Sequence, residues 1–229
     1  MTFVRSTSIL ATESCHRARA RRYLRGADLV ALPGRVRLIR PPTVFGAAPL
    51  VGLAFLLDAS VQRWAAQVQN TIADTVVGVL NPIGSGVTLL IVCIGLAILC
   101  RTLGCERAGA AAWLSALAFV VAGITEYALK RLVGRPRPTA GVTPAVLELD
   151  SFPSGHATSV FAVATVLGGF YPRLRWPLYM LAAAIAIGRV YLARHYLSDI
   201  VAGALIGLVV ASLLLHHRHA ISAGAVRPT

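Results

Sequence analysis

Charged residues are scarce in this 229-residue chain, at 14% of the total. A soluble domain usually carries about a quarter, so the composition argues against an ordinary soluble protein. Hydrophobic residues supply 56% of the chain. This balance indicates a protein whose solvent is largely lipid.

Acidic residues are the scarcest charged type, with 9 Asp and Glu against 22 Lys and Arg and a net charge of +13. In a soluble protein this excess would suggest a nucleic-acid partner. Here the basic residues alternate with apolar blocks, and Lys and Arg in the loops of a membrane protein set its orientation. We therefore expect the lipid bilayer as a partner and no nucleic acid.

Cysteine is limited to four residues, and no Cys-x-x-Cys pair occurs. Neither a zinc site nor a disulfide framework is predicted from this spacing. The four are interpreted as small buried or cytoplasmic thiols. They are Cys15, Cys93, Cys100 and Cys105.

Six apolar blocks follow a basic N-terminal segment. A straight spanning helix needs about 20 residues, with about 17 tolerated, and its backbone hydrogen bonds must be made within the segment. The sequence therefore predicts an all-α polytopic membrane protein with six transmembrane helices, the first, fourth and fifth of which must borrow residues from their flanks. The blocks lie near 43–57, 84–100, 108–129, 157–171, 177–190 and 197–215.

Three parts of the chain are predicted from these blocks. Residues 1–42 form a loosely ordered, basic cytoplasmic tail, residues 43–215 form the six-helix domain, and residues 216–229 form a C-terminal cytoplasmic tail. With the N-terminus inside, the inner segments hold fifteen Lys and Arg and the outer segments seven. This bias predicts that both termini are cytoplasmic. The Ala- and Arg-rich composition hints at a bacterial cell membrane.

Between the first two blocks, the segment 58–82 places apolar residues at helical spacing among polar ones. This pattern fits an amphipathic helix lying at the outer membrane interface. A plain connector helix outside the membrane would give the same pattern.

Three polar clusters reach the same outer side in this topology. They are KRLVGRPRP at 130–138, FPSGHA at 152–157 and RVYLARHYLSD at 189–199. Arginine grips phosphate oxygens through a bidentate fork and lysine adds a compact charge. Ser154 and Gly155 at a helix start would expose backbone N–H groups where the helix dipole is positive. Together these features indicate an anion site.

Two histidines border the predicted anion site. His156 follows Gly155 directly, and His195 and Asp199 are four residues apart, so on a helix they would share one face. A carboxylate bonded to one imidazole nitrogen leaves the other nitrogen free as a nucleophile. The pattern favours phosphoryl transfer.

Other polar residues near the clusters receive simpler interpretations. Glu126 stands four residues before Lys130 and is expected to pair with it. The remaining arginines of the outer side are interpreted as flanking charges. They are Arg131, Arg135 and Arg194.

The combined clusters resemble the signature of the type 2 phosphatidic acid phosphatase superfamily. That signature is Lys, six residues, Arg-Pro; then Pro-Ser-Gly-His; then Ser-Arg, five residues, His, three residues, Asp. The chain departs from it at Gly188, where the family usually has Ser, and this puts one peripheral contact in doubt. The resemblance covers roughly residues 44–215. The matching residues are Lys130, Arg137-Pro138, Pro153 to His156, Arg189, His195 and Asp199.

The resemblance implies a membrane phosphatase with its site at the outer interface and a lipid phosphate as substrate. His195 would be the nucleophile that forms a phosphohistidine, and Asp199 would orient it. His156 would protonate the leaving alkoxide and later activate water. The phosphoryl oxygens would be held by Lys130, Arg137, Arg189, Ser154 and the Gly155 amide.

No metal or other cofactor is expected. Two-metal phosphatases need several carboxylates to hold their ions. Near the predicted site the sequence supplies Asp199 and two acids of the loop before Ser151. The protein's own cations would stabilise the transition-state charge instead.

Two other functions remain open at this level. The same site could pass the phosphoryl group to a lipid or sugar acceptor instead of water. Alternatively, the chain could be a basic membrane scaffold without catalysis. The lipid head group, the preference for monophosphate or diphosphate and the oligomeric state are not encoded in the motifs.

Overall fold

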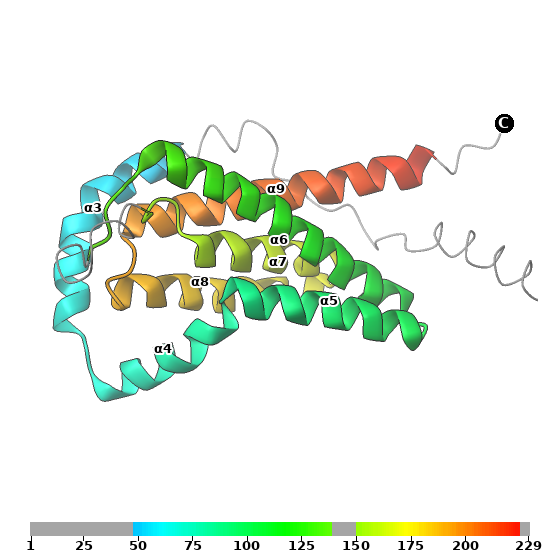
Figure 1. Ribbon diagram of the computed structural model, residues 1–229, viewed down its shortest axis with the longest axis horizontal. Coiled ribbons are helices and arrows are strands. Elements are labelled where there is room, and N and C mark those ends of the chain that lie inside the picture. The colour runs from blue at the N-terminus through cyan, green and yellow to red at the C-terminus, as the bar shows by residue number, and fades with distance from the viewer. Residues whose placement is uncertain (1–47, 139–149, 225–229) are drawn as a thin grey trace, which may run out of the picture.

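The computed structural model describes residues 48–138 and 150–224, and every regular element in these ranges is a helix. The predicted tail at 1–42 lies outside them. Figure 1 shows the helices, which are α3 (Ala48–Gln67), α4 (Thr71–Ile83), α5 (Gly86–Thr102), α6 (Glu106–Val133), α7 (Gly155–Phe170), the short 3-10 helix η2 (Pro172–Leu174), α8 (Arg175–Tyr191) and α9 (Leu197–Gly224).

Each predicted apolar block contains a helix, but six spans are not confirmed. Among the described residues, α6 and α9 are long and apolar enough to cross a membrane, and α4 with α5 would make a third span bent by 52°. α7 has 16 residues and α8 has 17. Both are short because the polar clusters cut them: α7 begins at Gly155, and α8 ends before the segment that carries His195.

The segment 58–82 is split between two helices, which corrects the single amphipathic helix predicted there. α3 continues to Gln67, and α4 begins after Asn70, whose side chain accepts a hydrogen bond from the Ala73 N–H at 3.0 Å. An Asn cap of this kind starts a new helix. Val76 and Val79 are exposed on α4 (Figure 1), whereas Val77 is buried and lies against Gly188 of α8.

At the C-terminal end, α9 runs on to Gly224. It therefore extends past residue 216, at which the sequence predicts the cytoplasmic tail to begin. Residues 225–229 of that tail lie outside the described ranges.

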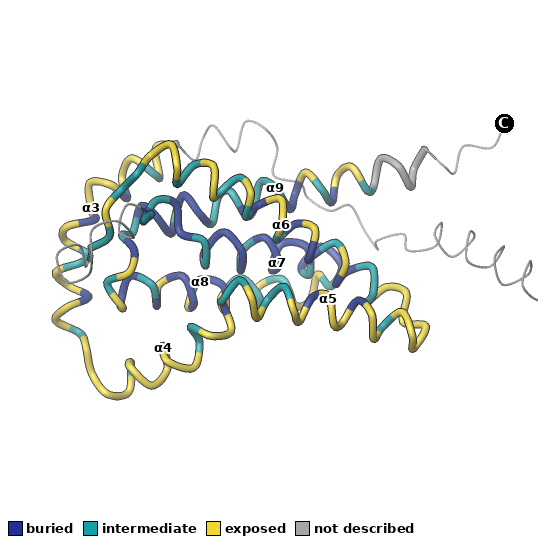
Figure 2. Tube along the Cα trace, viewed as in Figure 1, coloured by how far each residue is buried: buried dark blue, intermediate teal, exposed yellow. Residues whose placement is uncertain are grey.

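Helix α7 is the centre of the bundle. Twelve of its sixteen residues are buried, and Figure 2 shows it dark along its length, whereas α4 and α5 are largely exposed. Two of its buried hydroxyl groups donate hydrogen bonds to the carbonyl four residues earlier: Thr158 to Ser154 at 2.9 Å and Thr165 to Phe161 at 2.7 Å. This internal pairing lets polar residues remain in an apolar interior.

Helices α7 and α9 approach closely because α9 presents glycine at 203 and 207. A Cβ atom at Gly207 would lie 2.4 Å from the Thr158 carbonyl oxygen and 2.8 Å from the Ala162 nitrogen. A Cβ atom at Gly203 would lie 2.5 Å from the Ser154 carbonyl oxygen. Glycines four residues apart are a common way to bring two membrane helices together. They also hold the N-terminus of α7 against α9.

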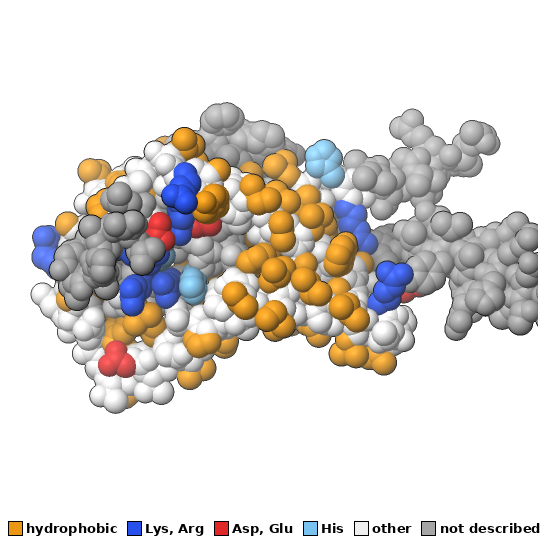
Figure 3. Space-filling view, viewed as in Figure 1, with side chains coloured by type: hydrophobic (Ala, Val, Ile, Leu, Met, Phe, Trp, Pro, Cys, Tyr) orange, Lys and Arg blue, Asp and Glu red, His pale blue; other side chains and the backbone are white. Residues whose placement is uncertain are grey.

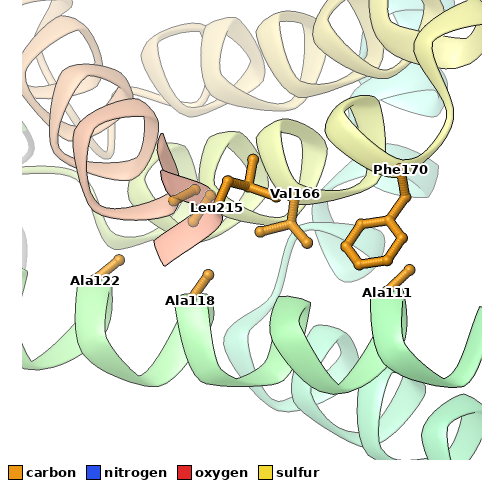
Figure 4. Close-up of a cluster of buried hydrophobic side chains, with 8 residues drawn as sticks. Ala111, Ala118, Ala122, Val166, Phe170 and Leu215 are labelled. Atoms are coloured by element: carbon orange, nitrogen blue, oxygen red, sulfur yellow. The ribbon is translucent and has the colours of Figure 1, made fainter. Parts of the chain in front are cut away.

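Small residues also bring α6 against the centre. Figure 4 shows Ala111, Ala118 and Ala122 of α6 facing Val166 and Phe170 of α7, with Leu215 of α9 in the same cluster. Alanine adds little volume, so the helices lie close and their contact depends on van der Waals packing.

The outer helix faces are apolar, unlike the surface of a soluble protein. Trp113 and Ile124 of α6 are each 65% exposed, and Ile91 of α5 is 65% exposed. Figure 3 shows hydrophobic side chains spread over the middle of the molecule. Exposed apolar area this extensive requires a lipid solvent or a large partner surface.

The close approach at Gly207 gives a test of the fold. Gly207→Ala should destabilise the protein by about 1–3 kcal/mol, because the new methyl group meets backbone atoms that cannot move aside. Gly95→Ala on α5 is the matched control, since a Cβ there meets nothing within 4 Å. It should be neutral or stabilising by about 0.4–1 kcal/mol. Thermal unfolding of the two variants in detergent measures the difference, and equal midpoints would contradict this packing.

Candidate active site

The three polar clusters come together at the end of the bundle where α3 and α4 lie. Figure 3 shows Lys, Arg, Asp, Glu and His side chains gathered at that end. The Lys130 ammonium lies 4.0 Å from Asp150, which precedes the second cluster, and the His195 imidazole bonds the Ser151 backbone. His156 is close enough to Lys130 and His195 to interact with both electrostatically.

His195 stands in the segment that joins α8 to α9, two residues before α9 begins. His195 therefore lies outside the helix that carries Asp199, but its side chain still makes the expected contact with that carboxylate. Its Nδ1 lies 2.8 Å from the Ser151 carbonyl oxygen and 3.5 Å from Asp199 Oδ2. Because a carbonyl oxygen can only accept, Nδ1 carries the proton in that bond. The Nε2 lone pair is then free.

Asp199 organises the residues around His195 and contacts the imidazole only at longer range. Oδ2 accepts hydrogen bonds from the Ser151 hydroxyl at 2.6 Å and from the Tyr196 N–H at 2.8 Å. The second bond resembles half of a capping box, in which an acid in the first turn reaches back to the residue before the helix. The carboxylate therefore fixes both the start of α9 and the residue whose carbonyl holds the imidazole.

Burial favours the neutral form of His195. Its side chain is 3% exposed, and this burial lowers its pKa below the ordinary value, while Asp199 opposes the shift and the Arg137 and Arg189 charges add to it. A neutral imidazole with a protonated Nδ1 is the form that can act as a nucleophile at Nε2.

The Pro-Ser-Gly-His sequence forms the N-terminus of α7. Ser154 is the capping residue, Gly155 is the first helical residue, and the Ser154 N–H donates to the Asp199 carbonyl at 3.0 Å. The first N–H groups of a helix have no partner within the helix and favour an anion. The Ser154 hydroxyl makes no capping bond.

Three buried polar atoms at this place have no hydrogen-bond partner among the described residues: Ser154 Oγ, His156 Nε2 and Arg189 Nε. Buried side-chain polar atoms are usually paired, so each exception calls for an explanation. The three belong to three predicted site residues, which indicates that they face a place for a polar ligand.

The predicted phosphate-binding cations already have partners. Lys130 forms the predicted ion pair with Glu126 at 2.8 Å. Arg137 binds Asp150 through two parallel bonds of 2.8 and 2.9 Å, and this guanidinium holds the pKa of the Asp150 carboxyl below its usual value.

Arg189 has a different kind of partner from the other two cations. It donates to the side-chain oxygen of Asn81 near the end of α4. This amide carries no charge, so the charge of Arg189 is not balanced by it.

Arg135 is not the flanking charge that the sequence suggests. Its guanidinium bonds Asp199 Oδ1 at 2.6 Å and Asp58 Oδ2 at 2.7 Å, and it also donates to the Ser198 hydroxyl at 2.6 Å. The rings of Tyr196 and Phe55 lie 4.0 and 4.8 Å from it. Aromatic faces attract a cation at such distances. Arg135 thus joins α3 to the first turn of α9.

Helix α3 contributes three side chains that sequence analysis missed. Asp58 accepts from the Ser198 N–H at 2.9 Å and from its hydroxyl at 2.6 Å, and Gln62 donates to the His195 carbonyl at 2.8 Å. With Phe55 they recur at helical spacing, so they share one face. The sequence signal that could have revealed them is this helical spacing around Asp58, an isolated acid that directly follows the first predicted apolar block.

Over residues 48–138 and 150–224, no group of three or more His, Cys, Asp or Glu side chains is arranged to hold a metal ion.

The link between α3 and α9 gives a second test. Asp58→Ala should lower stability by about 1–3 kcal/mol, because it removes one of the two carboxylates that Arg135 contacts and leaves the buried Ser198 N–H without its acceptor. The double variant Asp58→Ala with Arg135→Ala should cost less than the sum of the two single changes, by about 1–3 kcal/mol. Unfolding of the four proteins of this cycle measures the coupling. Additive effects would mean that the ion pair does not stabilise the fold.

Comparison with known proteins agrees with this geometry. Residues 111–222 match the PAP2 superfamily. The lipid A 1-phosphatase of Rhizobium etli is 34% identical over 107 residues, which is 42% of this chain and 46% of that protein. The decaprenylphosphoryl-5-phosphoribose phosphatase of Mycobacterium tuberculosis is 37% identical over 92 residues, 38% of this chain and 49% of that protein.

The chain thus spans about half the length of these curated relatives. A solved structure has a similar fold over a longer stretch. It is the transmembrane PAP2 type phosphatidylglycerolphosphate phosphatase of Bacillus subtilis, with a TM-score of 0.63, 21% identity, and coverage of 79% of this chain and 96% of that one. From the family match and the spanning helices, we conclude that the chain is an integral membrane protein that carries a PAP2 superfamily region at residues 111–222.

Proposed function

We propose that this protein hydrolyses a lipid phosphate or diphosphate, phosphatidate-like or polyprenyl, through a phosphohistidine and without a metal ion. The observation that carries the proposal is the set of three unpartnered buried groups on Ser154, His156 and Arg189, beside an imidazole whose Nδ1 bonds the Ser151 carbonyl, which leaves Nε2 unprotonated in the neutral ring. A phosphoryl group supplies several acceptor oxygens and would satisfy such donors together.

In the proposed complex, the phosphoryl oxygens lie at the N-terminus of α7. The Gly155 N–H and the Ser154 hydroxyl would donate to them, and the helix dipole would favour their charge. The surrounding cations would stabilise the charge that develops on the equatorial oxygens. They are Lys130, Arg137 and Arg189.

The first step breaks the bond from phosphorus to the lipid oxygen. Nε2 of His195 attacks phosphorus in line, and the electron pair of the breaking bond leaves with the alkoxide or phosphate. His156 in its protonated form donates a proton to that oxygen. The product is a phosphohistidine whose other nitrogen still donates to the Ser151 carbonyl, a bond that keeps the ring oriented.

The second step returns the protein to its starting form. His156, now neutral, takes one proton from water, and the oxygen attacks phosphorus as the P–N bond breaks. The electron pair returns to Nε2 of His195, and inorganic phosphate keeps the second hydrogen of the water. The names of the two relatives support this class of reaction, since both are phosphatases of lipid-linked phosphates.

The proposed orientation has both termini in the cytoplasm of a bacterial cell and the site on the outer side. The Lys and Arg bias of the segments supports it. The lipid chains of the substrate would stay in the bilayer beside the apolar outer faces, while the head group reaches the end of the bundle that carries α3 and α4.

Replacing each histidine tests the two roles. With purified protein, a panel of lipid phosphates and excess EDTA, His195→Ala should lower phosphate release at least about a thousandfold, because no phosphohistidine can form. His156→Ala should lower it by about 10²–10⁴-fold on alkyl monophosphates, and less on diphosphates, whose leaving group needs no proton.

Three outcomes would contradict the proposal. They are full activity of His195→Ala, activity that EDTA removes and magnesium restores, or labelled phosphate recovered on an acceptor lipid instead of in water. The last outcome would identify a phosphotransferase.

The pH dependence follows from the pKa of His195. Protonation of Nε2 removes the nucleophile, and burial lowers this pKa, so the neutral form persists below the ordinary value of about 6.5. The acid limb of kcat/KM should therefore lie below about pH 6.5. An aryl phosphate is the suitable substrate because its own ionisation lies lower than that of an alkyl phosphate. An acid limb above neutrality would contradict the assignment.

A further inference from the structure

Asp150 occupies the cations that the proposed reaction needs for phosphate. Its two oxygens accept from Nε and Nη2 of Arg137 at 2.8 and 2.9 Å, and one of them lies 4.0 Å from the Lys130 ammonium. A phosphate group would use the same planar fork, since guanidinium groups bind carboxylate and phosphate in the same bidentate geometry. Asp150 therefore competes directly with a phosphoryl group for Arg137.

Three of the four cations at the site already contact a carboxylate, whereas Arg189 bonds the uncharged amide of Asn81. An incoming anion gains little from a cation whose charge a carboxylate already balances. It uses one of the three paired cations well only if it replaces a carboxylate. The carboxylates are Asp58, Glu126, Asp150 and Asp199.

Among these carboxylates, Asp150 is the one that can leave. Its side chain is 45% exposed and belongs to a residue outside any helix. Glu126 is 13% exposed on α6, and Asp199 is fully buried on α9 with partners at both oxygens. Turning the Asp150 side chain into water costs little, because an exposed ion pair contributes little to stability.

We propose that Asp150 is a resident anion that sets substrate specificity by the charge of the competing phosphoryl group. This rests on the proposed function. A terminal phosphate monoester or diphosphate carries about two negative charges at neutral pH and offers three free oxygens. It gains charge over the carboxylate that it displaces.

A phosphodiester has one negative charge and two free oxygens, so it gains nothing by the exchange. The bilayer around the site consists largely of such diester lipids. Asp150 therefore keeps abundant diester head groups off Arg137 and Lys130, and it yields to the terminal phosphate of a substrate.

The test measures binding to the purified full chain in detergent, by titration calorimetry with inorganic phosphate and with diethyl phosphate at about pH 8, where inorganic phosphate is mostly a dianion. The wild-type protein should bind diethyl phosphate at least about tenfold more weakly than inorganic phosphate. Asp150→Asn should tighten diethyl phosphate binding by about tenfold or more and inorganic phosphate binding by less. The preference for the dianion should shrink accordingly.

Two further variants serve as controls. Asp150→Glu keeps the charge and should keep the wild-type preference. Glu106→Gln removes an exposed carboxylate at the first residue of α6, far along the helix from Lys130, and should change neither affinity. Each variant is compared only if its thermal unfolding midpoint matches that of the wild type; Asp150→Ser replaces Asp150→Asn if the latter does not fold.

Four results would overturn the inference. They are an unchanged preference in Asp150→Asn, equal tightening of both ligands, weakening of both ligands, or no binding of inorganic phosphate to any variant. Equal tightening would mean that Asp150 acts only through its charge, and weakening would mean that it holds Arg137 in place for phosphate. Because binding needs no turnover, a wild-type protein with the expected preference but without phosphate release would reject the proposed reaction alone.

Discussion

The guanidinium of Arg135 between Asp58 and Asp199 is the contact on which the site depends. It ties α3 to the start of α9, and Asp199 in turn fixes Ser151, whose carbonyl orients His195. A buried ion pair is a weak source of net stability, but a missing partner is costly. This link therefore matters for the position of the imidazole. The His195 ring keeps one orientation because Ser151 and Asp199 each have their hydrogen-bond partners.

Small residues along the helices hold this end of the bundle in place. Glycines on α9 and alanines on α6 let both helices approach α7, so the N-terminus of α7 is held against the carbonyl of Asp199. Lipid supplies no hydrophobic force between helices, so close backbone contact has to hold them together. The same close contact keeps the Ser154 and Gly155 N–H groups in place.

The motif residues could be predicted from sequence because their spacing along the chain is short and characteristic. The residues that hold the motif residues in place could not be predicted in this way. Arg135 looked like one more basic residue in KRLVGRPRP, and its partner Asp58 lies 77 residues away, so only the fold reveals the pair. Hydropathy located the helices, but the helix lengths do not confirm six spans, because hydropathy does not register where Gly155 and the residues around His195 end a helix. The contact of the Ser151 carbonyl with His195 could not be predicted from residue types, because this carbonyl is a backbone group.

Helix α3 lies wholly before residue 111, at which the family match begins. A polypeptide cut to the matched region would keep every signature residue and still lose Phe55, Asp58 and Gln62. Arg135 would then have only one carboxylate, and the carbonyl of His195 would lose its amide donor. The site of this protein therefore depends on side chains that lie outside the stretch matched by the family.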